Sequence, residues 1–422
     1  MGVDWRVNEK KDLKGNQIPG ATTGARGLVR DFLGLERNVA VMIAANSLQD
    51  LGQQMWAGYL SKVLQALGAT GKMLGAFGTA GSLTGTVSPY LGGLLSDRLG
   101  RGRALILASA LALAGYLIYL TGSVWWFFLP GVVLLGLAGY FRFLGSLALT
   151  GDQLREERRA ISIGVQNVIG RTPWIISPPL GGLLMGSSLG LLLGFRVAVG
   201  VTIVLTGGAI FLQHRYYHLP PPDRDDRPLH PLAVFRAMPG ELKRLLLAES
   251  LVRFGAGTCS MFIILYVMKV FRLGTEKYGL LLGLATATSV VMYVPVAKLA
   301  DRAGRASRRP FVTATFLFAA MFPLALLSIH SSAWLIPVFI LMGLKEFGEP
   351  ARKALILDLL PQASRGRQMG VYYALRGIAL FPAPLVGGLL WDWNYAAPFC
   401  IGGLVSGLGV LWFALEGMLW KS

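Results

Sequence analysis

The chain has 422 residues, of which 54% are hydrophobic and only 15% are charged, and its mean hydropathy is +0.55. Soluble domains carry about 25% charged residues, so this composition excludes an ordinary soluble protein and indicates an integral membrane protein. The net charge of +18 is dispersed over short segments between apolar stretches, which fits contact with lipid headgroups and leaves no patch for a nucleic acid.

Twelve apolar stretches approach the length of about 20 residues that a bilayer-spanning helix needs. They run over 38–61, 72–95, 104–122, 124–149, 160–186, 189–212, 245–269, 278–299, 310–329, 333–351, 368–391 and 396–419. We therefore predict an all-α membrane protein with twelve transmembrane helices, in six-helix bundles over 38–212 and 245–419. A polar N-terminal segment over 1–37 and a charged, Pro-rich linker over 213–244 complete the predicted domains.

The distribution of Lys and Arg predicts the orientation. If the N-terminus lies inside, the outside loops hold only Lys62, Lys72, Lys269, Arg272 and Lys277, and most other basic residues fall inside. Because basic loops stay on the cytoplasmic side, both termini and the linker are predicted to be cytoplasmic in a bacterial-type inner membrane. The two cysteines lie within apolar stretches, so their positions predict neither a disulfide nor a metal site.

The two halves of the sequence resemble each other. "GLLSDRLGRGR" begins at Gly93, and the weaker copy "AKLADRAGRASRR" begins at Ala297, so that Asp97 and Asp301 are 204 positions apart. A repeat of this length is too long for a solenoid. It predicts a duplicated half of a membrane transporter.

The first copy resembles the signature loop of the major facilitator superfamily, G-x-L-x-D-R-x-G-R-R, and it follows the second predicted span as that loop does. The resemblance implies two bundles that rock about a central site, with Asp97 as the central residue of a latch between them. The residues implied in the latch are Gly93, Asp97, Arg98, Gly100, Arg101, Asp301 and Arg302.

A second motif lies in the fifth predicted span. It resembles the antiporter motif of the same family, G-x8-G-x3-G-P-x2-G-G, through Gly164, Pro178, Gly181 and Gly182, with Pro173 and Ser177 at two glycine positions. The eleventh span repeats the skeleton from Gly370 to Gly388. Such a run predicts a kinked helix with a flat face of small residues, and the resemblance to drug/proton antiporters favours export.

Ionisable side chains inside a bilayer are costly, so those present are candidate site residues. In the first span, Asn46, Asp50 and Gln53 or Gln54 recur at helical spacing, so we expect one polar face that looks into the central cavity. A carboxyl group among apolar neighbours holds a proton more readily than in water. Asp50 is therefore a candidate proton or substrate site, with a permanent salt bridge as the alternative.

Further charged candidates lie in the later spans. Glu346 and Glu349 are three residues apart in the tenth span, where two close carboxyl groups would compete for ionisation and one would carry a proton. Arg142 would neutralise Asp50 or bind an anion. The remaining deep candidates are Arg171 and Arg376, together with Glu249 and Arg253, which are expected to form a structural pair at i and i+4.

Together these features predict a secondary transporter rather than an enzyme, because no phosphate-binding loop, zinc spacing or nucleophile elbow is found. The leading function is proton-coupled export of a small amphipathic organic molecule, without a metal or an organic cofactor. One alternative is uptake or exchange of an organic anion clamped by Arg142, Arg171 and Arg376. Another is a non-transporting receptor or lipid-handling protein. The expected partners are a small-molecule substrate and the lipid bilayer, and the family resemblance implies a monomer.

Overall fold

The computed structural model describes residues 37–99, 101–153, 159–217, 235–236, 238–302, 308–360 and 365–419, and every regular element in this part of the chain is a helix. The N-terminal half holds α2 (Arg37–Trp56), α3 (Leu60–Ala66), α4 (Gly71–Leu99), α5 (Arg101–Thr121), α6 (Phe128–Gln153), α7 (Arg159–Gly186) and α8 (Gly190–Tyr216). The C-terminal half holds α10 (Gly240–Ser260), α11 (Ile263–Val270), α12 (Thr275–Arg302), α13 (Arg308–Ser328), α14 (Leu335–Leu344), α15 (Glu349–Leu359), α16 (Arg365–Leu380), α17 (Ala383–Trp393) and α18 (Ala397–Leu419). Short 3-10 helices at Ala57–Tyr59, Trp125–Phe127 and Ser332–Trp334 precede α3, α6 and α14.

Each predicted span coincides with one helix or with two consecutive helices, which confirms the helical membrane fold. Among the described residues, six helices are long and apolar enough to cross a bilayer. The number becomes seven if α10 and α11, which meet at a bend of 48°, count as one span. The count of twelve crossings stays a prediction, because breaks divide several of the predicted spans.

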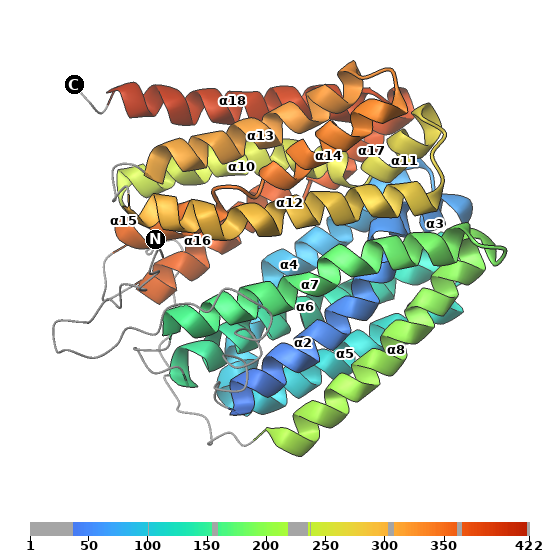
Figure 1. Cartoon of the computed structure of the whole chain (residues 1–422). Coiled ribbons are helices and arrows are strands. Elements are labelled where there is room, and N and C mark those ends of the chain that lie inside the picture. The colour runs from blue at the N-terminus through green and yellow to red at the C-terminus, as the bar shows by residue number, and fades with distance from the viewer. Residues whose placement is uncertain are drawn as a thin grey trace, which may run out of the picture.

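The helices of the two halves form two groups that meet along a shared boundary (Figure 1). α2, α5, α6 and α8 lie in the lower group of the view, and α10, α12, α13 and α18 lie in the upper group. Across the boundary, α7 packs along α12, and α4 packs on α17 and α16. A site at this boundary therefore receives side chains from both halves.

One end of the boundary is filled by a hydrophobic cluster, and we call it the closed end. It lies where α3, α11 and α17 meet, at the right of Figure 1. The N-terminal half contributes the buried Trp56 and Tyr59, and the C-terminal half contributes the buried Phe262 and Tyr278. The rings of Tyr59 and Tyr278 meet edge to face across the boundary, with centroids 5.8 Å apart. Buried side chains of both halves therefore pack against each other at this end.

Glycines allow the backbones to approach closely at this end. A Cβ atom on Gly181 would overlap the carbonyl oxygen of Met55, and one on Gly182 would lie 2.5 Å from the carbonyl oxygen of Thr275. In the other half, Gly387 lies against Thr258, and Gly388 lies against Gly71. The predicted small-residue face is thus present, since α7 and α17 use it to pack against helices of both halves.

Hydrogen bonds also tie the halves together at the closed end. Thr275 donates through its hydroxyl to the carbonyl of Gly182 at 3.0 Å. The hydroxyl of Tyr59 donates to the carbonyl of Pro178 in its own half at 2.7 Å, and it also lies 3.4 Å from the carbonyl oxygen of Thr275 in the other half. The carboxylate of Asp392, at the end of α17, accepts from the backbone N–H of Gly71 at 2.8 Å and of Lys72 at 2.9 Å. Asp392 therefore caps the first turn of α4, a helix of the opposite half.

The packing at Gly181 predicts a loss of stability in Gly181→Ala. The added methyl group has no room beside the backbone of Met55, and overpacking of this kind costs about 1–3 kcal/mol. Thermal unfolding of the purified protein in detergent should show a lower midpoint than wild type. Gly200→Ala is the matched control, because a Cβ atom at Gly200 meets no atom within 4 Å. Equal midpoints for the two variants would contradict this packing.

The cap from Asp392 predicts that Asp392→Ala opens the closed end more often. Loss of a helix cap costs about 1 kcal/mol, which shifts an equilibrium roughly fivefold. Ser61, which is buried and bonds to Met261 across the boundary, is replaced by Cys in a background without Cys259 and Cys400. A membrane-impermeant maleimide should then label this Cys about fivefold faster in Asp392→Ala than in the parent. Unchanged labelling would show that the cap does not hold the halves together.

Candidate functional site

A cavity of about 620 Å³ lies between the halves, inward from the closed end. Its volume falls within the range of about 300–1,000 Å³ that small-molecule sites occupy. The N-terminal half lines it with Ile43, Asn46, Asp50, Gly170, Arg171 and Trp174, and the C-terminal half with Leu282, Ala285, Thr286, Ser289, Met342, Gly343, Lys345 and Glu346. A molecule in this cavity contacts both halves at once.

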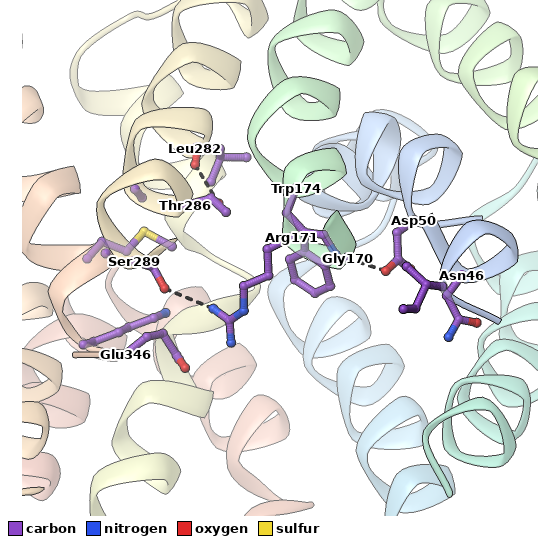
Figure 2. Close-up of a pocket in the computed structure, with 14 residues that line it drawn as sticks. Asn46, Asp50, Gly170, Arg171, Trp174, Leu282, Thr286, Ser289 and Glu346 are labelled. Atoms are coloured by element: carbon purple, nitrogen blue, oxygen red, sulfur yellow. Dashed lines mark hydrogen bonds between the residues drawn. The ribbon is translucent and has the colours of Figure 1, made fainter. Parts of the chain in front are cut away.

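Asp50, on α2, lies on the N-terminal wall of the cavity and is held from two sides. Its carboxylate lies 2.9 Å from the Nη2 atom of Arg142 on α6, and it accepts a hydrogen bond of 3.2 Å from the indole N–H of Trp174 on α7. Figure 2 shows the contact between Trp174 and Asp50. The salt bridge weighed as an alternative from the sequence is therefore present in this conformation, and Asp50 also faces the cavity.

The polar face predicted for the first span divides between two environments. Asn46 lines the cavity and donates to Ser146 on α6 at 3.1 Å. Gln53 instead accepts a hydrogen bond of 3.2 Å from the buried hydroxyl of Tyr116 on α5, and neither Gln53 nor Gln54 is among the lining residues. Gln53 turns toward α5 because a buried tyrosine hydroxyl needs a partner. Gln53 therefore does not line the cavity in this conformation.

Arg171 reaches across the cavity from one half to the other. Its Nη1 atom donates to the hydroxyl of Ser289 on α12 at 3.2 Å, and its guanidinium lies 5.0 Å from the ring centroid of Tyr293. Figure 2 shows this side chain extending from α7 toward Ser289, on the side of Glu346. In the part of the chain that the structure describes, Arg171 has no carboxylate partner.

The predicted pair of Glu346 and Glu349 is not formed. α14 ends at Leu344 and α15 begins at Glu349, with a turn between them. Glu346 lines the cavity, whereas Glu349 points to Arg352. Pro350 explains the break, because proline disfavours a continuous helix through the residues before it. The two carboxyl groups therefore lie in different environments.

A buried ion network occupies the C-terminal half. Glu249, which is fully buried, lies 2.8 Å from Arg253 and 2.7 Å from Arg376, and it also contacts Arg352. Arg352 in turn lies 2.6 Å from Glu349. The hydroxyl of Tyr372 donates to Glu249 at 2.5 Å. The expected pair of Glu249 and Arg253 is thus one part of a network that ties α10, α15 and α16 together.

Arg352 is the member of this network that the sequence did not suggest. Its side chain is only 2% exposed, but it follows the predicted end of the tenth span at residue 351. The signal that could have found it is its spacing of three residues from Glu349, which places the two side chains on one face of a helix.

The predicted arginine clamp is not assembled in this conformation. Arg142 is paired with Asp50, and Arg376 is paired with Glu249 and lies over the ring of Tyr373 at 4.6 Å. Of the three arginines, Arg171 alone lines the cavity. Ion pairing within each half therefore removes two members of the clamp.

The predicted latch residues lie at helix ends. Gly93, Asp97 and Arg98 lie in the last turns of α4, and Arg101 begins α5. Asp301 and Arg302 are the last residues of α12. Gly100 and the side chains of the other latch residues lie outside what the structure describes, so the latch stays a prediction. Gly164 lies in the second turn of α7, and Pro178 accepts the hydrogen bond of Tyr59 described above.

Comparison with known proteins gives the family. The family model described as Major Facilitator Superfamily matches residues 42–348 and, in a second match, residues 245–417. An uncharacterised MFS-type transporter of Methanocaldococcus jannaschii is 22% identical over 396 residues, covering 89% of this chain and 95% of the relative. The multidrug resistance protein MdtG of Serratia proteamaculans is 26% identical over 335 residues, covering 75% and 77%.

A solved structure supports the same assignment at the level of the fold. The crystal structure of the nucleoside transporter NupG superposes with a TM-score of 0.69 at 12% identity, covering 92% of this chain and 100% of that one. The resemblance inferred from the sequence motifs is confirmed. The chain belongs to the major facilitator superfamily, and it is a secondary transporter of the membrane rather than an enzyme.

Proposed function

We propose that this transporter exports a small amphipathic organic molecule in exchange for protons. The observation that carries the proposal is the cavity between the halves, which holds two carboxyl groups, Asp50 and Glu346, beside apolar side chains and Trp174. The similarity to a protein named for multidrug resistance supports the direction of transport and the broad class of substrate.

The two carboxyl groups differ in how they would carry a proton. A proton on Asp50 would remove the charge that Arg142 balances at 2.9 Å, so protonation there releases Arg142. Glu346 lies in the turn between α14 and α15 and has no ion pair in the described part of the chain. Protonation of Glu346 therefore breaks no salt bridge. A cationic group of the substrate competes with the proton at either carboxylate.

Alternating access gives this exchange its direction. The closed end holds the connections that the basic-residue distribution assigns to the outside, so the described conformation is the one sealed against the outside. A substrate from the inside would then occupy the cavity and favour the state in which the closed end parts. Protons from outside would replace the substrate at the carboxylates and favour the return.

The proposal predicts loss of substrate-driven proton movement in Asp50→Asn and in Glu346→Gln. Purified protein is placed in liposomes that contain a pH-sensitive dye, and lipophilic cations and organic anions are added one at a time under an imposed pH gradient. Wild type should move protons in response to a cationic or zwitterionic compound. At least one variant should lose about 90% of that flux, because a neutral amide cannot exchange a proton. Glu241→Gln is the matched control, since Glu241 lies in the first turn of α10 and is not among the lining residues.

Other outcomes separate the rival functions. Transport of anions alone, with Asp50→Asn unaffected, would replace export by organic-anion exchange. Substrate transport without proton movement in wild type would remove the coupling. Binding without flux for every compound would support a receptor or lipid-handling role.

A further inference from the structure

The charged residues of the cavity do not balance one another. Asp50 lies against Arg142, so this pair contributes little net charge. The charged lining residues that remain are Arg171, Lys345 and Glu346. Two cations against one carboxylate leave an excess positive charge in a half-buried site between low-dielectric walls. Such an excess is costly unless an anion completes the site.

Among the residues that the structure describes, only neutral groups contact the guanidinium of Arg171. Its hydrogen bond to Ser289 uses one of the five N–H groups of the guanidinium, and the ring of Tyr293 supports its flat face. Neither contact neutralises its charge. The planar guanidinium is thus held at the cavity wall with donors free for a planar anionic group, which is the geometry that carboxylates fit.

Lys345 is the second cation, and it comes from the other half. It lies in the turn before α15, and no carboxylate oxygen within the described residues, that of neighbouring Glu346 included, lies within ion-pair distance of its ammonium group. Hydrogen bonds from the backbone hold this turn on both sides of Lys345 and Glu346. Lys345 donates through its backbone to Leu341, and Gly348 donates through its backbone to the hydroxyl of Thr315 at 2.6 Å. Lys345 therefore faces the cavity because the break in the helix places it there.

We propose that Arg171 and Lys345 form a subsite for a carboxylate of the transported molecule, and that this molecule is a zwitterion whose cationic group lies toward Glu346. The inference rests on the proposed function, because it takes this cavity as the substrate site. A carboxylate held by Arg171 from α7 and by Lys345 from the opposite half links the two halves. Substrate binding then acts directly on the boundary along which they move.

Matched pairs of a free acid and its methyl ester test this subsite. The first pair is rhodamine 110, a zwitterion with a free carboxylate, and rhodamine 123, its cationic methyl ester. Further amphipathic acid and ester pairs complete the panel. Equilibrium binding to wild-type protein in lipid nanodiscs, without a pH gradient, is measured by fluorescence polarisation or by displacement of a bound dye.

Wild type should prefer the acid of at least one pair roughly ten- to a hundredfold over its ester. Arg171→Gln and Lys345→Gln should each reduce that preference about tenfold while affinity for the ester stays within a factor of two. Arg171→Lys should restore part of it. Lys62→Gln, which removes a cation bonded to Gln65 outside the cavity, should change nothing.

Two results would overturn the subsite. One is a wild-type protein that binds no acid of the panel more tightly than its ester. The other is equal loss of acid and ester binding in Arg171→Gln together with the same loss in Ser289→Ala. That result would mean that the bond between Arg171 and Ser289 serves only to join the halves. The test is independent of proton coupling. A wild type that shows proton-driven flux but no acid preference defeats this inference alone, and a wild type that shows acid preference but no proton-driven flux defeats the coupling alone.

Discussion

Every charge within the bilayer must be paired or must reach water, and this constraint decides which residues of the protein are free to act. In the N-terminal half, Arg142 balances Asp50 at the cavity wall. In the C-terminal half, Arg352 is surrounded by Glu249 and Glu349, and removing one partner of such a buried pair costs about 3–5 kcal/mol. These ion pairs join neighbouring helices within each bundle. Among the charged residues left without such partners in the described chain, Arg171, Lys345 and Glu346 line the cavity between the halves.

The sequence predicted the features that depend on a local pattern of residues, namely the helices and the family motif. Hydropathy located the helices, because a span is a continuous property of the chain, and the Asp-Arg motif gave the family. Partners distant in the sequence could not be predicted by helical spacing. Gln53 bonds to Tyr116, and Gln49 bonds to Ser109, which donates in turn to Gln213. A polar side chain on a spanning helix can thus serve a neighbouring helix or the cavity, and spacing within one helix does not distinguish the two.

The break between α14 and α15 is a second feature that helical spacing alone did not predict. The spacing of Glu346 and Glu349 predicts one shared face only if the helix continues, and the turn before Glu349 separates them. Pro350 was a visible signal for this break. The break turns Lys345 and Glu346 toward the cavity and starts α15 so that Arg352 is buried with Glu349. One interruption therefore supplies both the charged cavity wall and the network that anchors it.

The two copies of the glycine motif correspond to two matching helix crossings at the closed end. Gly182 meets the start of α12 at Thr275, and Gly388 meets the start of α4 at Gly71. The two glycines are 206 positions apart, and their partners are 204 positions apart, so each half places the same crossing against the other. The cap from Asp392 strengthens one of the two crossings. Parting the closed end must break both crossings together, which favours a concerted rocking of the halves. The motif thus serves the interface between the bundles, and the proposed proton coupling would fall to the carboxyl groups of the cavity.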